Sequence, residues 1–321
     1  MSNFYSINYC VKMRSDQEWI DAVLRSVKEL NNFNYKDDNS TTGNVGFYIN
    51  ELKVGILVPE VIHELENYPD TFEFTRQDNK IVKVCLNKKH VSVEERSLAM
   101  KLVLDDLRQK DKFFTLRGWR NETYPIYYTF HESALLHMER SGCALFGVIQ
   151  YGVHINGYTY KNGEMMMWIG RRSKTKQTYP NMLDNMCAGG LASGLGVTEC
   201  AIKECQEEGS VDDESLTKLK PVGSVSYCFR DKRGILPEQQ FVYDLEVSPS
   251  FIPKNADGEM QNFSLFTVKE IQDLIIAGEF KPNCAMVIIN FLIRHGYMNA
   301  DNCAHYPYIV EMMHKSLQPP M

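Results

Sequence analysis

The chain has 321 residues, of which 44% are hydrophobic and 24% charged, and its formal net charge is −6. This composition is typical of a globular protein with two domains, and the negative charge argues against nucleic acid as the main partner. No run approaches the ~20 apolar residues that span a bilayer. The N-terminus also lacks the regions of a secretory signal. We therefore expect no membrane partner and a cytoplasmic location, with the nucleus left open.

The nine cysteines are scattered along the chain and form no Cys-x-x-Cys pair. Zinc ligation normally requires such paired spacing, so packing is the simpler role for these side chains. An odd number of cysteines without a secretory signal predicts a reduced, intracellular protein.

The first part of the chain predicts a small α+β domain. Residues 16–31 and 93–110 carry apolar positions at helical spacing. The composition of residues 46–58 is typical of strand structure, and residues 72–86 are typical of a hairpin around Asp78-Asn79. We place the apolar stripe of the second helix at Leu98, Ala99, Leu102, Val103 and Leu107.

The second part predicts strands that alternate with helices. Residues 143–160 indicate a strand, a turn and a second strand, and residues 165–173 a further strand. A loop then leads to a glycine-rich segment and a helix within 189–209. A strand pair (222–247) and two helices (267–280 and 283–296) complete the pattern, and the last three residues should fray.

The segment CAGGLASGLGVTECAIKECQEEGSV, residues 187–211, joins the glycines to a run of acids. On a helix, Glu204, Glu207 and Glu208 share one side because they are three and four positions apart. One interpretation is a solvated acidic face. The other is a site for Mg²⁺ or Mn²⁺, since hard cations take carboxylate oxygens and bind phosphates as well.

The glycine-rich loop favours the metal site over the solvated face. Glycines let the backbone approach a ligand closely, and this loop leads directly into the acidic helix. The carbonyl of Ala188 or Gly189 is therefore a candidate further ligand.

The same segment resembles the Nudix box, which is a Gly, five residues, Glu, seven residues, then Arg-Glu-apolar-x-Glu-Glu-x-Gly-apolar. With Gly189 first, Lys203 falls at the Arg position, and Glu204, Glu207 and Glu208 at the acids. The resemblance implies that these acids hold divalent cations while a diphosphate is cleaved by water. We expect all four charged residues to be catalytic, with Glu204 and Glu208 as ligands and Glu207 as ligand or base.

The resemblance also implies the fold class, which is α/β. It implies a Nudix α/β/α sandwich with a mixed sheet, preceded by the small α+β domain. We expect domains over residues 1–140 and 141–300, followed by a C-terminal tail over 301–321.

Three positions depart from the box. Leu195 stands where the first Glu belongs, Lys203 replaces the Arg, and Ser210 occupies the closing Gly position. Lysine keeps the charge of arginine but loses its planar fork. These departures leave open a binding module that holds its diphosphate ligand, which the next resemblance identifies as thiamine diphosphate, without cleaving it.

A narrower resemblance extends beyond the box. Residues 118–126, 138–158, 168–191, 222–247 and 278–296 look like the Nudix subfamily related to the domain fused to some thiamine pyrophosphokinases. It implies metabolite repair, with thiamine diphosphate or its oxidised oxo- and oxythiamine forms cleaved to monophosphate and phosphate. An enzyme that sanitises oxidised nucleotides is the remaining alternative. The partner is then a small-molecule diphosphate, and the oligomeric state stays open.

Other candidate contacts lie outside the box. Arg171, Arg172, Lys174 and Lys176 place four cations within six residues, and we expect one or two to bind phosphate. Glu259 is a candidate metal ligand or base, ahead of Glu238. The aromatic candidates for stacking on the organic group, each of which can equally be a packing residue, are Trp119, Tyr151, His154, Trp168 and Tyr227.

Overall fold

The computed structural model describes residues 17–35, 43–130, 132–256 and 258–318. Within these ranges, every helix is too short or too polar to cross a bilayer. The expected fraying of the last three residues, and Cys10, lie outside the described ranges.

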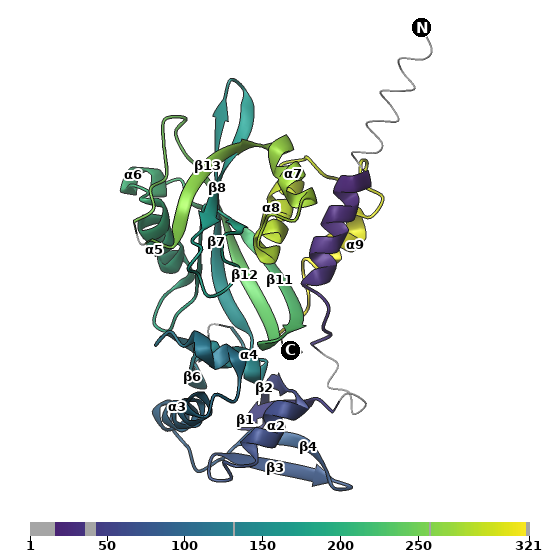
Figure 1. Ribbon diagram of the computed structural model, residues 1–321, viewed down its shortest axis with the longest axis vertical. Helices are drawn as coiled ribbons and strands as arrows, with labels where there is room; N and C mark the ends of the chain where they lie inside the picture. Colours follow the sequence, from purple (N-terminus) through teal and green to yellow (C-terminus); the bar gives the residue numbers. More distant parts are fainter. Residues whose placement is uncertain (1–16, 36–42, 131, 257, 319–321) are drawn as a thin grey trace.

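A mixed seven-stranded sheet forms the centre of the second half of the chain (Figure 1). Its main order is β11 (Lys220–Asp231), β12 (Gly234–Glu246), β7 (Gln150–Lys161), β8 (Glu164–Arg172) and β13 (Met260–Thr267). The pair β12–β7 is parallel, and the other neighbours in this order are antiparallel. Two short strands, β9 (Leu183–Asp184) and β10 (Cys187–Gly190), pair with β8 and β7.

Helices cover both faces of this sheet. Figure 1 shows α5 (Val197–Gly209) and α6 (Asp213–Leu216) on one side and α7 (Val268–Ile276) and α8 (Pro282–Arg294) on the other. Because successive strand residues point to opposite faces, β7 serves both layers. Val153 packs in the α5 cluster and Tyr158 in the α8 cluster. The predicted α/β/α sandwich is confirmed.

The first half builds a separate four-stranded sheet. Its order is β2 (Leu52–Leu57), β1 (Val45–Ile49), β4 (Lys80–Leu86) and β3 (Phe72–Gln77), packed with α2 (Pro59–Leu65) and α3 (Val93–Gln109). The hairpin predicted at Asp78-Asn79 is confirmed, with both residues at positive φ. The strand structure predicted over 46–58 is confirmed and consists of two strands, because Asn50 and Glu51 form a turn between β1 and β2.

The predicted apolar stripe of α3 is partly wrong. Ser92 and Glu95 form a capping box at the start of the helix. The buried face then follows Ala99, Met100, Val103, Leu104 and Leu107. Leu98 and Leu102 remain 57% and 60% exposed. The observed face is rotated by about one residue, and it takes in Met100 and Leu104, which the prediction omitted.

A small connecting unit joins the two sheets. It contains η1 (Phe114–Gly118), β5 (Thr123–Ile126), β6 (Leu136–Glu139), η2 (Arg140–Gly142) and α4 (Cys143–Phe146). The strand, turn and second strand predicted over 143–160 are therefore wrong, because α4 is followed by one continuous strand, β7. Gly147 ends α4 at φ 54°, and a Cβ there would lie 2.4 Å from the carbonyl oxygen of Ile56.

Both ends of the described chain pack on the second sheet. The N-terminal helix, residues 17–29, buries Trp19 and Val23 in the same cluster as Ile309 of α9 (Tyr306–Met312). The Asn31 side chain donates a hydrogen bond of 2.8 Å to the Met312 carbonyl, and Figure 1 shows the two helices side by side. The first helix thus belongs to the sandwich in packing, although it precedes the first sheet in sequence.

Candidate active site

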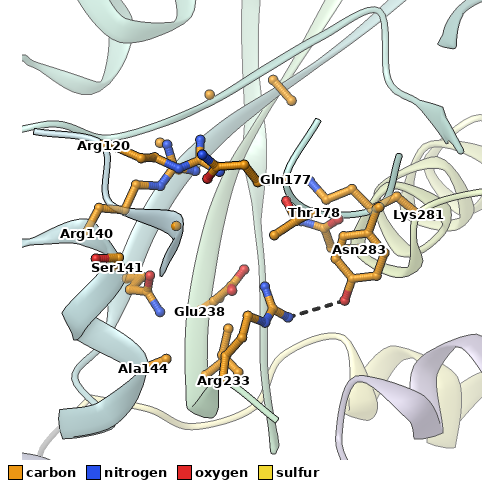
Figure 2. A pocket seen from close by; sticks show the side chains of 18 of the residues that line it. Arg120, Arg140, Ser141, Ala144, Gln177, Thr178, Arg233, Glu238, Lys281 and Asn283 are labelled. Atoms are coloured by element: carbon orange, nitrogen blue, oxygen red, sulfur yellow. Dashed lines mark hydrogen bonds between the residues drawn. The ribbon is translucent and has the colours of Figure 1, made fainter. Parts of the chain in front are cut away.

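A cavity of about 570 Å³ lies where the connecting unit meets the second sheet. The connecting unit contributes residues between 114 and 144, and the sheet contributes β7, β10, β11 and β12. The loop that follows β8 and the first turn of α8 close the remaining sides. Figure 2 shows Arg120 and Arg140 entering from one side, opposite Lys281 and Asn283.

Helix α5 carries its acids to the edge of this cavity. The helix begins at Val197, where the Glu199 carboxylate accepts the Gly196 N–H at 2.9 Å. Glu204 and Glu207 line the cavity. A Cβ on Gly189 would lie 2.2 Å from Glu204 Cδ. The missing side chain at Gly189 therefore makes room for the Glu204 carboxylate.

Glu208 is the most buried of the three acids. It is 2% exposed, and its carboxylate accepts the Ala188 N–H at 2.8 Å. Burial raises the pKa of Glu208 to about 8, although this hydrogen bond opposes the shift. Burial also raises the pKa of Glu204, and the negative charge of Glu207 adds to that effect.

These acids fit a divalent cation. Glu208, which is buried, and Glu204, which is partly buried, both have a raised pKa, lie one helical turn apart and face the backbone of β10. Carboxylate and carbonyl oxygens are the donors that Mg²⁺ and Mn²⁺ prefer. A bound cation would favour the ionised form of both groups by placing a positive charge beside them.

The three departures from the box each have a structural account. Leu195 packs against the hydrophobic cluster under α5. Lys203 Nζ lies 2.7 Å from Glu207 and 3.5 Å from Glu204, so it holds both carboxylates. Ser210 adopts the left-handed conformation that glycine favours, with φ 49°, and its hydroxyl donates to the Lys254 carbonyl.

The basic loop sends only part of its charge into the cavity. Arg172 and Lys176 line it, whereas Arg171 donates to the Asn181 carbonyl at 2.8 Å and Lys174 is exposed. Neither Arg171 nor Lys174 lines this cavity, so a phosphate contact by either one is not supported.

Arg172 is held by the loop around it. Its guanidinium donates to the Asp184 carboxylate at 2.6 Å and to the carbonyls of Thr178 and Tyr179. Arg172 therefore shapes the loop. Lys176 is the better placed of the two for phosphate, and burial lowers its pKa to about 8.

The two other acids predicted near the site both line the cavity. Glu259 forms an ion pair with Lys176. Glu238 accepts the Tyr227 hydroxyl at 2.7 Å and the Gln240 amide at 2.9 Å. Glu238 thus presents a fixed carboxylate on the wall formed by β11 and β12.

Some of the predicted aromatic residues line the cavity, and the others do not. Tyr151, His154 and Tyr227 line the cavity. Trp119 donates to Asn121 and lies under the Arg108 guanidinium, 4.7 Å from it. Trp168 packs in the cluster under α5. Neither tryptophan is among the cavity-lining residues.

The sequence prediction missed the residues that the connecting unit brings to the cavity. Arg120, Tyr124 and Arg140 all line it. The Tyr124 hydroxyl lies so close to Gly190 that a Cβ there would be 1.7 Å away. All three residues lie far before the box loop in the sequence, so no local spacing could have connected them with it.

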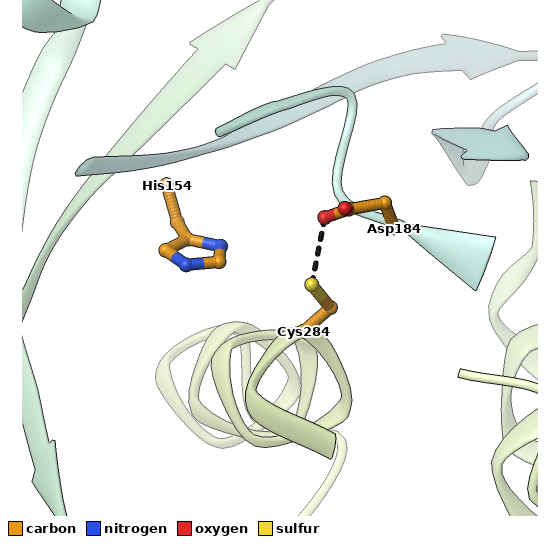
Figure 3. Close-up of side chains that lie close together, drawn as sticks. All are labelled: His154, Asp184 and Cys284. Carbon is orange, nitrogen blue, oxygen red and sulfur yellow. Dashed lines mark hydrogen bonds between the residues drawn. The ribbon is translucent and has the colours of Figure 1, made fainter. Parts of the chain in front are cut away.

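A second cluster is formed by the buried side chains of His154, Asp184 and Cys284, of which His154 also lines the cavity (Figure 3). Asp184 already accepts bonds from Arg172 at 2.6 Å and from the Cys284 thiol at 2.7 Å. Burial opposes its ionisation, yet Lys281 and Arg172 hold the pKa of Asp184 below its usual range. We interpret this cluster as a charge-balanced hydrogen-bond network and not as a metal centre.

The eight cysteines in the described ranges are all free and buried. This agrees with the packing role expected from their spacing.

Two family models match the chain. A domain of unknown function, DUF4743, matches residues 22–150, and the NUDIX domain matches residues 152–284. The first therefore covers the four-stranded sheet and the connecting unit, and the second covers most of the sandwich with the acidic helix.

Several curated proteins are similar over most of their length. An uncharacterised protein of Saccharomyces cerevisiae is 35% identical over 83% of this chain and 81% of its own. Chloroplastic Nudix hydrolases 20 and 24 of Arabidopsis thaliana are 35% and 33% identical, over 81% and 89% of this chain and 70% and 74% of theirs. The chain therefore belongs to the Nudix hydrolase family and is a Nudix pyrophosphohydrolase.

Proposed function

We propose that the chain is a divalent-metal-dependent diphosphatase for thiamine diphosphate derivatives. Its preferred substrates are the oxidised oxo- and oxythiamine diphosphates, and its products are the monophosphate and phosphate. The observation that carries the catalytic part is the position of Glu204, Glu207 and Glu208. They occupy one turn of α5 next to β10, and Glu204, Glu207 and the glycines of β10 line a cavity that also holds several cations.

Mg²⁺ or Mn²⁺ would be held by Glu204 and Glu208, with Glu207 and the carbonyl of Gly189 or Ala188 as further donors. Bound there, the cation supplies neutralising charge for the diphosphate and a water of lowered pKa. Glu259 is the less suitable ligand, because its carboxylate pairs with Lys176.

The remaining residues of the site bind and orient. Lys203 keeps Glu204 and Glu207 in position through its two ion pairs. Glu207 is exposed and lines the cavity, so it can accept a proton from the attacking water. Lys176 presents a cation to the phosphate, which strengthens its protonation by adding negative charge nearby.

The wall formed by β11 and β12 supports the thiamine assignment. Tyr227 and Phe229 of β11 line the cavity, with ring centroids 6.2 Å apart. The Glu238 carboxylate on the same wall can accept a ring amino group or balance a thiazolium charge. Aromatic and anionic surfaces together suit a cationic, amino-substituted heterocycle.

A substrate panel tests this assignment. Purified protein with Mg²⁺ would be assayed for phosphate release from thiamine, oxothiamine and oxythiamine diphosphates, beside ADP-ribose and oxidised nucleoside triphosphates. We expect kcat/KM for an oxidised thiamine diphosphate to exceed that for any nucleotide by at least about tenfold. Preference for a nucleotide would refute the thiamine assignment. Tight binding without phosphate release would instead identify a binding module.

A further inference from the structure

Arg120 lines the active-site cavity without a neutralising partner. Its backbone N–H donates to Glu139, but its guanidinium has no hydrogen bond or ion pair with any residue in the described ranges. The residue belongs to the connecting unit, and Figure 2 shows its side chain beside Arg140 and Gln177. It is therefore an available cation supplied from outside the Nudix domain.

The neighbouring cations each have a carboxylate of their own. Arg140 pairs with Glu122 at 2.9 Å, and Arg172 pairs with Asp184 at 2.6 Å. Lys176 pairs with Glu259. Of these four cations, Arg120 is the one without a carboxylate partner in the described ranges.

The electrostatics of Arg120 agree with that geometry. Burial lowers the pKa of Arg120, and the positive charges of Arg140 and Arg172 lower it further. A guanidinium nevertheless stays protonated at neutral pH. An anion entering the cavity would relieve the repulsion among these cations.

The backbone around Arg120 is fixed in place. The Glu139 carboxylate, which is 5% exposed, accepts the Arg120 N–H at 3.0 Å and the Ser141 N–H at 3.3 Å. One carboxylate thus holds the two segments that carry Arg120 and Arg140. On the other side, a Cβ on Gly118 would lie 3.2 Å from the Gln177 side chain, next to Lys176. The backbone that carries Arg120 is therefore held close to the loop that carries Lys176.

The same unit also contacts the box loop. The Tyr124 hydroxyl abuts Gly190, and the Arg140 guanidinium lies 5.2 Å from the centre of the Tyr124 ring. The connecting unit and the acids of α5 consequently border one continuous cavity.

We propose that Arg120 binds a phosphate group of the substrate, so that the domain matched by DUF4743 completes the active site of the Nudix domain. Arginine suits this role because its planar fork can make two parallel bonds to a phosphate. The inference rests on diphosphate binding in this cavity, which belongs to the proposed function. It does not depend on the organic group of the substrate.

The test measures binding of methylenediphosphonate, a non-hydrolysable diphosphate, in the presence of Mg²⁺ by titration calorimetry. We expect Arg120→Ala to weaken binding about 10- to 100-fold, the usual range for losing a charged hydrogen bond. Arg120→Lys should recover part of the affinity, and the melting temperature of both variants should not fall. Arg76→Ala is the matched control, since Arg76 is exposed on β3, pairs with Glu66 and lies outside the cavity lining.

Each outcome decides the proposal. Unchanged affinity in Arg120→Ala would overturn it, as would a wild-type protein that does not bind the diphosphonate. Weaker binding with a lowered melting temperature and no recovery in Arg120→Lys would also overturn it, by assigning a structural role. If the diphosphonate result holds but no thiamine diphosphate is hydrolysed, the substrate assignment fails and the role of Arg120 stands.

Discussion

Glu208 should couple the stability of the metal-free protein to pH. The side chain is 2% exposed, and burial raises its pKa to about 8. In an unfolded chain a glutamate has a pKa of about 4.3. Between these two values the folded state holds a proton that the unfolded state lacks, so stability falls as pH rises.

The size of this pH dependence follows from the single proton that Glu208 binds in the folded state. From about pH 6.5 to about pH 8, Glu208 should cost the metal-free protein about 1 to 2 kcal/mol of stability. Two other shifted groups act mainly outside this window, and both have the opposite sign. The pKa of His154 is lowered by burial to about 4, so most of its effect lies below pH 6.5. The pKa of Lys176 is lowered by burial to about 8, so its effect begins near the upper end of the window and grows above it.

Glu208→Gln isolates this contribution, because the amide oxygen can still accept the Ala188 N–H. Urea unfolding in EDTA across the window should show a flatter dependence for the variant than for the wild type. Glu207→Gln, at an exposed position on the same helix, is the control and should keep the wild-type slope. Parallel curves for wild type and Glu208→Gln would refute the buried, protonated carboxyl.

Three substitutions within residues 187–211, the segment that resembles the Nudix box, test its packing. Gly189→Ala places a Cβ 2.2 Å from Glu204 Cδ, so it should reduce turnover and Mn²⁺ affinity about tenfold or more while the melting temperature stays close to wild type. Gly190→Ala meets the Tyr124 hydroxyl at 1.7 Å and should cost about 1–3 kcal/mol in urea unfolding, partly restored by adding Tyr124→Phe. Ser210→Gly relieves a left-handed φ of 49° and should change stability by at most about 1 kcal/mol. Its turnover should match wild type, and a large gain in activity would show that Ser210 impairs the box.

Local patterns predicted the elements that depend on local chemistry. Asp78 and Asn79 tolerate positive φ, which identifies a two-residue hairpin without knowledge of the rest of the fold. The spacing of Glu204 and Glu208 likewise fixes their common side of α5. Where the chain reverses through Asn50 and Glu51, neither a glycine nor a proline marks the turn, and the prediction of strand structure over 46–58 did not locate it.

Tertiary contacts decided what local patterns could not. Leu98 and Leu102 have the hydrophobicity of core residues, yet the sheet that α3 meets leaves them exposed. The four cations at the end of β8 and just after it cannot be distinguished from the sequence. The folded structure shows that Arg172 is bonded to Asp184, whereas Lys176 pairs with another carboxylate. Arg120 reaches the cavity because the connecting unit packs against the sandwich. No hydrophobic periodicity in the sequence predicts that contact.

The most direct test of the account is a crystal of this protein soaked with Mn²⁺ and a diphosphate, measured by anomalous scattering. We predict an anomalous peak bonded to carboxylate oxygens of Glu204 and Glu208, next to the diphosphate and the carbonyls of β10. A well-defined diphosphate with no metal at these carboxylates would contradict the account.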